Sequence, residues 1–378
     1  MRLMDQGKGP GGKLAARKGV AVDQCLECGE CSRSCGLLAE VGMSPKRLAE
    51  GGVTASTAFS CTLCGGCEAA CPAGVSPREL FAAGRRSAVA AGELDIEVYR
   101  YLLPDRPNSL MSVFREYSGI DYRDIEASGS AACCFFPGCT LLTYAPQLTR
   151  RVFNRLKDDC GCSGLLTDCC GKPLSQMGLT ARADRVVGRL LERIRAHNVR
   201  ELIVACPGCY YELRSPLAAA GVRLRTVYEA LVLPAAQQSG KVCAVHDSCP
   251  DRFEGIFGRQ VRQLLAAGGF SLAELNHSGL NTMCCGSGGM ISHFRPDLTQ
   301  ALVEARLAEA RATGADGLVS YCMSCVLKFV AKAGELPTGH VLGLLLGQPD
   351  DLADAKGKVA RMLEGPEGAE IWAKIMAD

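Results

Sequence analysis

Cysteine constrains this chain more than any other residue, because 23 of its 378 residues are cysteine and eighteen of these recur at fixed spacings. Two runs near the N-terminus share the spacing Cys-x2-Cys-x2-Cys-x3-Cys. In such runs three thiolates on one loop hold three corners of a [4Fe–4S] cube, and the fourth cysteine ligates the other cube. We therefore predict two cubane clusters, one held by Cys25, Cys28, Cys31 and Cys71 and the other by Cys61, Cys64, Cys67 and Cys35.

Zinc is the alternative occupant of these runs, because Cys-x2-Cys pairs also bind zinc. Eight cysteines in two matched runs favour iron–sulfur clusters. The first run departs from the ferredoxin pattern in one respect, because Gly36 follows its last cysteine, Cys35, whereas Pro72 follows Cys71 in the second run. Residues 43–57 and 77–91 are rich in helix formers, so we predict an all-helical ferredoxin domain.

An internal repeat built on ten further cysteines occupies the rest of the chain. Each copy has a single cysteine, then Cys-Cys-Gly, then a Cys-x2-Cys pair. The first copy contains Cys139, Cys169, Cys170, Cys206 and Cys209. The second copy contains Cys249, Cys284, Cys285, Cys322 and Cys325. This recurrence predicts two related domains.

Short apolar segments that precede the cysteines predict β-strands, at residues 132–136, 202–205, 241–246 and 317–321. Helical patterns separate them, at residues 148–157, 181–196, 257–267 and 298–312. Strands that alternate with helices predict α/β domains with short parallel sheets. Binding sites of such sheets form beyond the carboxyl ends of the strands, and both repeats place cysteines there.

The predicted fold class is therefore α+β multidomain, with a helical two-cluster ferredoxin domain followed by two tandem α/β domains. The predicted segments are a basic glycine-rich tail (1–20), the ferredoxin domain (21–100), a linker (101–130), the two repeats (131–236 and 237–349) and a helical extension (350–378). The tail is expected to be disordered. The extension, which contains the single tryptophan Trp372, is expected to dock on the second repeat or on another subunit.

Composition excludes several classes of protein. The formal net charge of +2 argues against a nucleic-acid binder, which usually has a strong basic excess. The N-terminus lacks the apolar segment of a signal peptide, and no apolar run is long enough to cross a bilayer. We expect a cytoplasmic protein. If it associates with the inner membrane, we expect a partner to hold it there peripherally.

These motifs resemble a known family. The repeat is similar to the CCG domain of heterodisulfide reductase B-type subunits, and the N-terminal part resembles their C-type subunits. Their order resembles the D subunit of the membrane-associated heterodisulfide reductase. Iron–sulfur subunits of glycolate oxidase and of anaerobic glycerol-3-phosphate dehydrogenase share this layout. The resemblance covers roughly residues 21–330.

The resemblance implies a noncubane [4Fe–4S] cluster in each repeat, held by its five cysteines, and a reaction that cleaves or forms a disulfide. It also implies that His246, which precedes Asp247 and Cys249, lines the second cluster and donates a proton to a leaving thiolate. A structural role for this histidine is the alternative. Cubane clusters, zinc or a purely structural role are alternatives for the repeat, although five thiolates exceed the four ligands of structural zinc.

Five cysteines match no motif: Cys133, Cys134, Cys160, Cys162 and Cys243. The predicted strands contain Cys133, Cys134 and Cys243, and we expect these to pack in the core. Cys160 and Cys162 fall in a predicted loop, where redox reactivity is the alternative to packing.

Two further features lie beside the motifs. Lys172 follows the first Cys-Cys-Gly. We expect it either to attract an anionic substrate or to be an ordinary surface lysine. The glycine-rich residues 286–289 lack the spacing of a phosphate-binding loop, so we expect close backbone approach to a cluster there.

The sequence therefore predicts an oxidoreductase subunit that passes electrons from ferredoxin-type clusters to noncubane clusters, which act on a small thiol–disulfide pair. No flavin or nicotinamide fingerprint is evident, so the donor is expected to be a redox protein: a flavoprotein, a hydrogenase-type protein or a membrane cytochrome. The alternative is a non-catalytic relay for a dehydrogenase of glycolate, lactate or glycerol-3-phosphate that feeds a quinone pool. A scaffold with vestigial clusters is a third, disfavoured possibility.

Overall fold

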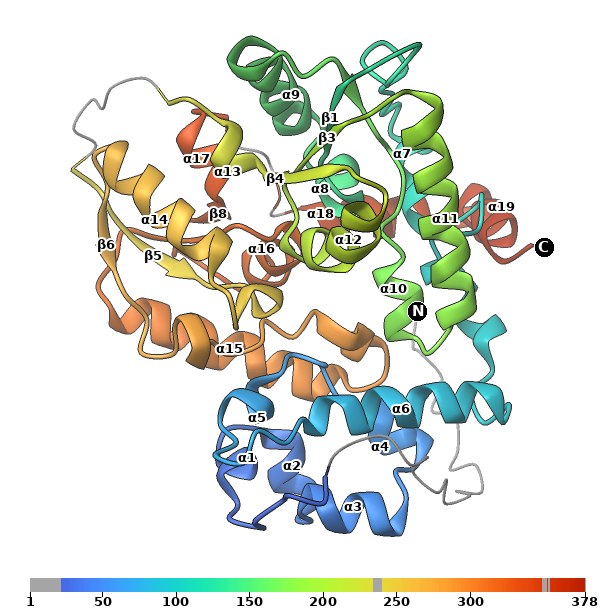
Figure 1. Cartoon of the computed structure of the whole chain (residues 1–378), viewed down its shortest axis with the longest axis vertical. Helices are drawn as coiled ribbons and strands as arrows, with labels where there is room; N and C mark the ends of the chain where they lie inside the picture. Colours follow the sequence, from blue (N-terminus) through green and yellow to red (C-terminus); the bar gives the residue numbers. More distant parts are fainter. Residues whose placement is uncertain (1–21, 234–239, 349–351, 353, 378) are drawn as a thin grey trace.

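Two short parallel sheets organise the repeats, and a helical N-terminal region packs beside them (Figure 1). The computed structural model describes residues 22–233, 240–348, 352 and 354–377. The predicted tail, residues 1–20, lies outside these residues. The observed α/β architecture confirms the predicted fold class.

Helices are the only regular elements among the described residues of the N-terminal region, which contain no strand. Its elements are α1 (Glu30–Arg33), α2 (Gly36–Val41), α3 (Pro45–Gly51), α4 (Ala55–Phe59), α5 (Gly66–Ala69) and α6 (Pro77–Ala90). Helix α3 shows why these segments form helices: Ser44 caps it by accepting a hydrogen bond from the Arg47 N–H, and Pro45 occupies its first turn. The longest helix, α6, buries Leu80, Phe81 and Ala88 along one face.

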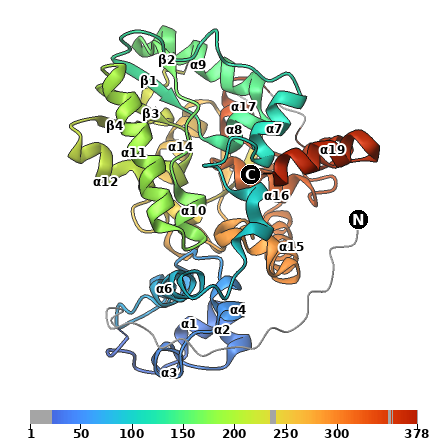
Figure 2. The same cartoon turned by 90° about the vertical axis from the view of Figure 1, so that its right-hand side faces the viewer.

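Residues 96–117 connect this region to the sheets through η1 (Ile96–Leu102) and α7 (Leu110–Tyr117). The chain ends in α18 (Ala355–Met362) and α19 (Gly365–Met376), which pack on α7 (Figure 2). Met362 and Ile375 share a buried cluster with Val113 and Phe114. The C-terminal helices therefore dock on the linker helix, whereas we had expected the second repeat or another subunit.

The first sheet has the strand order β2-β1-β3-β4 and is parallel throughout. Its strands are β1 (Cys133–Phe136), β2 (Gly164–Leu165), β3 (Glu201–Val204) and β4 (Arg223–Thr226). Its helices are α8 (Cys139–Tyr144), α9 (Pro146–Cys160), α10 (Lys172–Gln176), α11 (Thr180–Ala196), α12 (Pro207–Ala219) and α13 (Val227–Ala230). Strand β1 is an unbroken apolar run because both faces of this parallel sheet are covered by helices.

The second sheet repeats this order as β6-β5-β7-β8. Its strands are β5 (Val242–His246), β6 (Ser271–Ala273), β7 (Gly317–Ser320) and β8 (Thr338–His340). Its helices are η2 (Cys249–Asp251), α14 (Ile256–Ala267), η3 (Gly279–Asn281), η4 (Gly288–His293), α15 (Pro296–Ala312), α16 (Met323–Val330) and α17 (Val341–Leu345).

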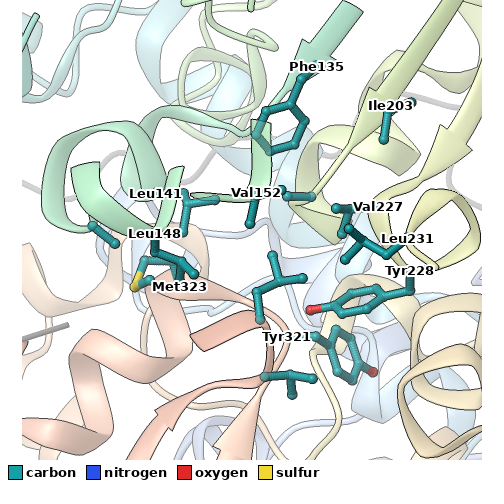
Figure 3. Close-up of a cluster of buried hydrophobic side chains, with 14 of the residues drawn as sticks. Phe135, Leu141, Leu148, Val152, Ile203, Val227, Tyr228, Leu231, Tyr321 and Met323 are labelled. Carbon is teal, nitrogen blue, oxygen red and sulfur yellow. The ribbon is translucent and has the colours of Figure 1, made fainter. Parts of the chain in front are cut away.

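The two repeats share one hydrophobic core (Figure 3). Phe135, Leu141 and Ile203 of the first repeat belong to the same buried cluster as Tyr321 and Met323 of the second. Burial of this apolar surface holds the repeats in one relative orientation. It thereby sets how their carboxyl strand ends, and the cysteines there, face each other.

Candidate iron–sulfur centres

The cysteines of the first repeat converge beyond the carboxyl ends of β1 and β3. Cys139 begins α8, while Cys206 caps α12 and Cys209 lies in its first turn. Hydrogen bonds between thiols link Cys169 to Cys170, Cys170 to Cys209 and Cys209 to Cys206, and Cys139 interacts electrostatically with Cys170. The structure thus brings all five predicted residues of the first site together.

The second repeat gathers its five cysteines in the same way. Cys249 begins η2, Cys322 caps α16 and Cys325 lies in the first turn of that helix. An unbroken series of thiol hydrogen bonds runs in the order Cys249, Cys284, Cys285, Cys325 and Cys322. A helix N-terminus carries a partial positive charge, which stabilises the thiolates that iron requires.

Two thiol contacts connect separate sites. Cys206 of the first repeat is hydrogen bonded to Cys322 of the second. Cys64 of the ferredoxin region is hydrogen bonded to Cys284 of the second repeat. The sites therefore follow one another in the order ferredoxin region, second repeat, first repeat.

The fourth cysteine of each ferredoxin run lies near the first three cysteines of the other run. Cys35 interacts electrostatically with Cys64, and also with Cys61 and Cys67. The other set lines a cavity of about 630 Å³, whose walls include Cys25, Cys28, Cys31 and Cys71. The Cys64 set lies against the second repeat, so we call it the inner ferredoxin site and the other set the outer ferredoxin site.

Glycines shape the loops at these sites. Gly171 and Gly286, the third residues of the two Cys-Cys-Gly motifs, have φ angles of +80° and +76°. A Cβ atom on Gly286 would lie 2.9 Å from the Thr299 carbonyl oxygen, and one on Gly171 would lie 3.1 Å from that of Ala183. Both motifs therefore need glycine for its backbone conformation and for close approach to a helix.

The donor set fits iron–sulfur clusters. Burial raises the pKa of the Cys61 thiol to about 12 and that of Cys139 to about 11. Binding of iron must therefore displace protons, as it does at buried thiolate sites. Gly138 lies beside the first site. A Cβ atom there would lie 3.3 Å from the Cys209 Sγ atom, so glycine leaves free the space that a side chain would take.

His246 lies at the end of β5 beside the second site and is fully buried. One of its ring nitrogens and the sulfurs of Cys285 and Cys325 all lie within 4.8 Å of one another. Its Nδ1 accepts a hydrogen bond of 3.0 Å from the Arg306 Nε atom. An arginine nitrogen always donates, so the proton of the neutral imidazole is on Nε2. That Nε2 atom has no hydrogen-bond partner among the described residues.

The charge state of His246 follows from the same surroundings. Burial, with the Arg306 guanidinium beside it, lowers the pKa of His246 to about 3. The imidazole is therefore neutral near pH 7, with one N–H group aimed at the second site. This geometry makes His246 a hydrogen-bond donor to sulfur and a poor source of a transferable proton.

Lys172, whose role the sequence left open, lies between the two repeats. Burial opposes its charge, but the Cys249 and Cys206 thiols on either side raise its pKa above the ordinary lysine value. A Cβ atom on Gly208 would lie 3.3 Å from the Lys172 Nζ atom. Its ammonium group is thus positioned between both sites and is not an ordinary surface charge.

Two buried arginines at the ferredoxin interface were not found from the sequence. Arg85, which is fully buried, donates to the carbonyls of Ala58, Cys61, Gln176 and Gly289. Arg252 donates to the carbonyl of Cys64 at 3.1 Å and to those of Leu280 and Thr282. These guanidinium groups join the inner cluster loop to both repeats. The sequence does contain one sign that Arg85 is buried, because it falls on the apolar face of α6, between Phe81 and Ala88.

The glycine-rich residues 286–289 approach the ferredoxin loop. A Cβ atom on Gly288 would lie 2.5 Å from the Thr62 carbonyl oxygen and 3.9 Å from the Cys284 Sγ atom. The close backbone approach that we predicted is therefore made to the loop of the inner ferredoxin site.

The unassigned cysteines divide into two groups. Cys134 and Cys243 are buried in β1 and β5 and pack as small apolar residues. Cys133, Cys160 and Cys162 lie together beside β1, and Cys160 is the last residue of α9, where we had expected a loop.

The fold and these cysteine sets define an iron–sulfur electron-transfer protein. Residues 21–75 match the 4Fe-4S dicluster domain family, and residues 133–214 and 243–330 match the cysteine-rich domain family CCG. The chain therefore carries an N-terminal 4Fe-4S dicluster domain followed by two CCG domains, which confirms the resemblance of the motifs.

Several curated proteins are similar to this chain over most or part of its length. The D subunit of dihydromethanophenazine:CoB–CoM heterodisulfide reductase from Methanosarcina barkeri is 25% identical over 82% of this chain and 89% of its own length. The B subunit of fumarate reductase (CoM/CoB) from Methanothermobacter marburgensis is 23% identical over 80% of this chain and 66% of its own length. The EtfAB:quinone oxidoreductase of Syntrophomonas wolfei is 26% identical over 37% of this chain and 21% of its own length. These relatives place the chain among oxidoreductases.

No helix among the described residues combines the length and the apolar composition that crossing a bilayer requires.

Proposed function

We propose that the chain holds four [4Fe–4S] clusters. Two are cubanes, at the outer and inner ferredoxin sites defined above. Two are noncubane clusters, one for each set of five repeat cysteines. Support comes from the thiol contacts that join the five members of each set.

We propose that the clusters of the two repeats act together on one small thiol–disulfide pair, by the reaction RSSR + 2e⁻ + 2H⁺ → 2 RSH or its reverse. The observation that carries this proposal is the contact between Cys206 and Cys322. It sets two thiolate-rich sites side by side, so a disulfide bound next to both can receive one electron from each. When bound, the clusters supply these electrons and an iron atom that can accept a sulfur ligand.

The chain's own residues bind and orient the substrate. The Lys172 ammonium lies between the two sites and attracts an anionic thiol or disulfide there. The His246 Nε2–H group, which has no partner among the described residues, is free to donate a hydrogen bond to sulfur of a cluster held at the second site and to stabilise added negative charge there. In this proposal His246 positions and stabilises, and the protons of the reaction come from elsewhere.

Electrons enter at the outer ferredoxin site. Cys28 is exposed there, and the side chain of the neighbouring Leu26 is 68% exposed. An exposed cluster loop with apolar surroundings suits the transient docking of a redox protein. The donor is a flavoprotein, a hydrogenase-type protein or a membrane cytochrome, and the last of these would hold the chain peripherally at a membrane.

Electron paramagnetic resonance of the anaerobic holoprotein tests this function. A panel of small disulfides and thiols, with anionic and neutral members, is added after reduction. The expected result is that at least one anionic member changes the signal of a repeat cluster and leaves the ferredoxin signals unchanged. Cys325→Ala should abolish this response.

The opposite result favours the alternative function. If no panel member perturbs either repeat cluster, while the protein still passes electrons from a dehydrogenase to a quinone-linked acceptor, the chain is a relay. The contact between Cys64 and Cys284 gives such a relay a direct route out of the ferredoxin region.

A further inference from the structure

Three cysteines that belong to no cluster motif meet at the amino end of β1. Cys133 is the first residue of β1, Cys160 ends α9, and Cys162 follows two residues later. The Cys133 thiol interacts with the thiols of both Cys162 and Cys160, and it also donates to the Glu201 Oε1 atom at 3.9 Å. The three residues come from separate elements, so the fold alone creates this cluster, which we call the β1 thiol cluster.

The surroundings of Cys133 favour its thiolate. The hydrogen bond from Cys162 lowers the pKa of Cys133, and the nearby Arg225 guanidinium contributes, while Glu201 opposes the shift. Arg225 is itself ion-paired with Glu201 at 2.9 Å, which weakens the repulsion from that carboxylate. Cys133 is only half-buried, so a small reagent can reach it.

The equivalent residue of the second repeat provides an internal comparison. Cys243 in β5 precedes Cys249 by the same number of residues as Cys133 precedes Cys139. No thiol partner accompanies Cys243 among the described residues, and burial raises its pKa. The β1 thiol cluster is therefore a feature of the first repeat alone and does not follow from the shared fold.

The cluster is also separate from the iron ligands. Cys133 lies at the amino end of β1, whereas Cys139 follows the carboxyl end. The strand places about 10 Å between these ends, at about 3.3 Å per residue.

We propose that Cys133, Cys160 and Cys162 form a thiol–disulfide site that works independently of the iron–sulfur clusters, in which Cys133 attacks small disulfides and Cys162 resolves the product. The Cys133 thiolate displaces one thiolate from a low-molecular-weight disulfide and forms a mixed disulfide. Cys162 then attacks the Cys133 sulfur, releases the second thiolate and loses its proton. The chain gains one disulfide, and the small disulfide is reduced to two thiols.

Backbone geometry favours Cys162 over Cys160 as the resolving residue. Ser163 N–H donates to the Cys133 carbonyl at 2.9 Å, which places Ser163 opposite Cys133 and Cys162 one residue before that position. One residue of offset along a backbone that lies about 4.8 Å away gives a Cα separation of about 6 Å, within the range of about 4.4–6.8 Å that a disulfide spans. The Cys160 thiol donates to the Leu156 carbonyl of its own helix at 3.1 Å, whereas the Cys162 thiol makes a longer bond of 3.7 Å to the Gly164 carbonyl.

Anaerobic holoprotein treated with 2-hydroxyethyl disulfide tests the proposal. Free thiols are then blocked with N-ethylmaleimide, and peptides are mapped by mass spectrometry while iron content and paramagnetic signals are followed. The expected product is a Cys133–Cys162 disulfide with no loss of iron. Cys162→Ser should trap the mixed disulfide on Cys133, and Cys160→Ser should behave as the wild type.

Cys243→Ser is the matched control and should form the Cys133–Cys162 disulfide at the wild-type rate. In the wild type Cys133 should react at least about tenfold faster than Cys243, because the thiolate is the nucleophile. Equal reactivity of Cys133 and Cys243, a Cys133–Cys160 disulfide in place of the expected one, or a disulfide that appears only as iron is lost would each overturn the proposal. None of these outcomes bears on the disulfide reaction proposed for the clusters, because that reaction is read from their paramagnetic signals.

Discussion

The Cys206 thiol is hydrogen bonded to the Cys322 thiol, although the two residues belong to different repeats and different sheets. Each residue caps the helix that carries the second cysteine of its own Cys-x2-Cys pair. The contact depends on the core shared by the repeats, which orients the carboxyl ends of both sheets toward each other. Substitutions can therefore separate the roles of the individual sites.

Cys71→Ala and Cys35→Ala should remove different clusters. Cys71 lines the cavity of the outer ferredoxin site, whereas Cys35 interacts with the inner set. Each variant is expected to lose about 4 of about 16 Fe per chain. Because electrons enter at the outer site and the inner site adjoins the second repeat, both variants should stop the reduction of the repeat clusters by a donor that docks at the outer site. Iron assays measure the loss, and paramagnetic resonance identifies which cluster is gone. Loss of the same cluster signal in both variants would refute the cross-ligation.

Arg85→Gln should loosen the junction between the ferredoxin region and both repeats. The guanidinium donates to carbonyls in all three parts, including those of Cys61, Gln176 and Gly289. Loss of these bonds leaves buried carbonyls without donors, and we expect the free energy of unfolding to fall by about 3 kcal/mol. Thermal unfolding of the anaerobic holoprotein measures this change. Arg86→Gln is the control, since Arg86 is exposed on the next position of α6, and equal midpoints in the two variants would contradict the assignment.

His246→Phe should lower the reduction potential of the second repeat cluster. A hydrogen bond to sulfur stabilises the more negative, reduced form, so its loss favours the oxidised form. A bond worth about 1.4 kcal/mol more in the reduced form corresponds to about 59 mV for one electron. A redox titration followed by paramagnetic resonance gives the potential.

His246→Gln is the matched variant for this measurement, because its amide retains an N–H donor and should restore much of the potential. Arg306→Met should also shift the potential, since it frees the His246 tautomer that Arg306 fixes. An unchanged potential in His246→Phe would show that Nε2–H does not reach the cluster.

Lys172→Gln should weaken the binding of an anionic substrate more than it slows the chemistry. The ammonium lies between Cys206 and Cys249, where its attraction is little screened by water. We expect KM for an anionic disulfide to rise about tenfold, equivalent to about 1.4 kcal/mol, with little change for a neutral disulfide. Steady-state kinetics with the two substrates measures this, and Lys157→Gln, on the exposed face of α9, controls for net charge. An equal effect on both substrates would exclude an anion-binding role.

The local sequence determined the motifs and the principal elements. Strands β1, β3, β5 and β7 were predictable because they are continuous apolar runs, as centrally placed parallel strands are. Edge strands such as β2, which has only two residues, carry no such run and were missed. Helices α9, α11, α14 and α15 were predictable from their periodicity, since one face of each is buried.

Tertiary structure alone decided which sites meet and how buried charges are used. Nothing local to Cys206 or Cys64 indicates that their partners are Cys322 and Cys284, because those contacts depend on how whole domains pack. The same holds for Arg306, whose hydrogen bond sets the proton of His246, and for the meeting of Cys133 with Cys162. Spacing along the chain specifies the ligands within one loop, whereas contacts between loops arise only when apolar faces far apart in sequence are buried together.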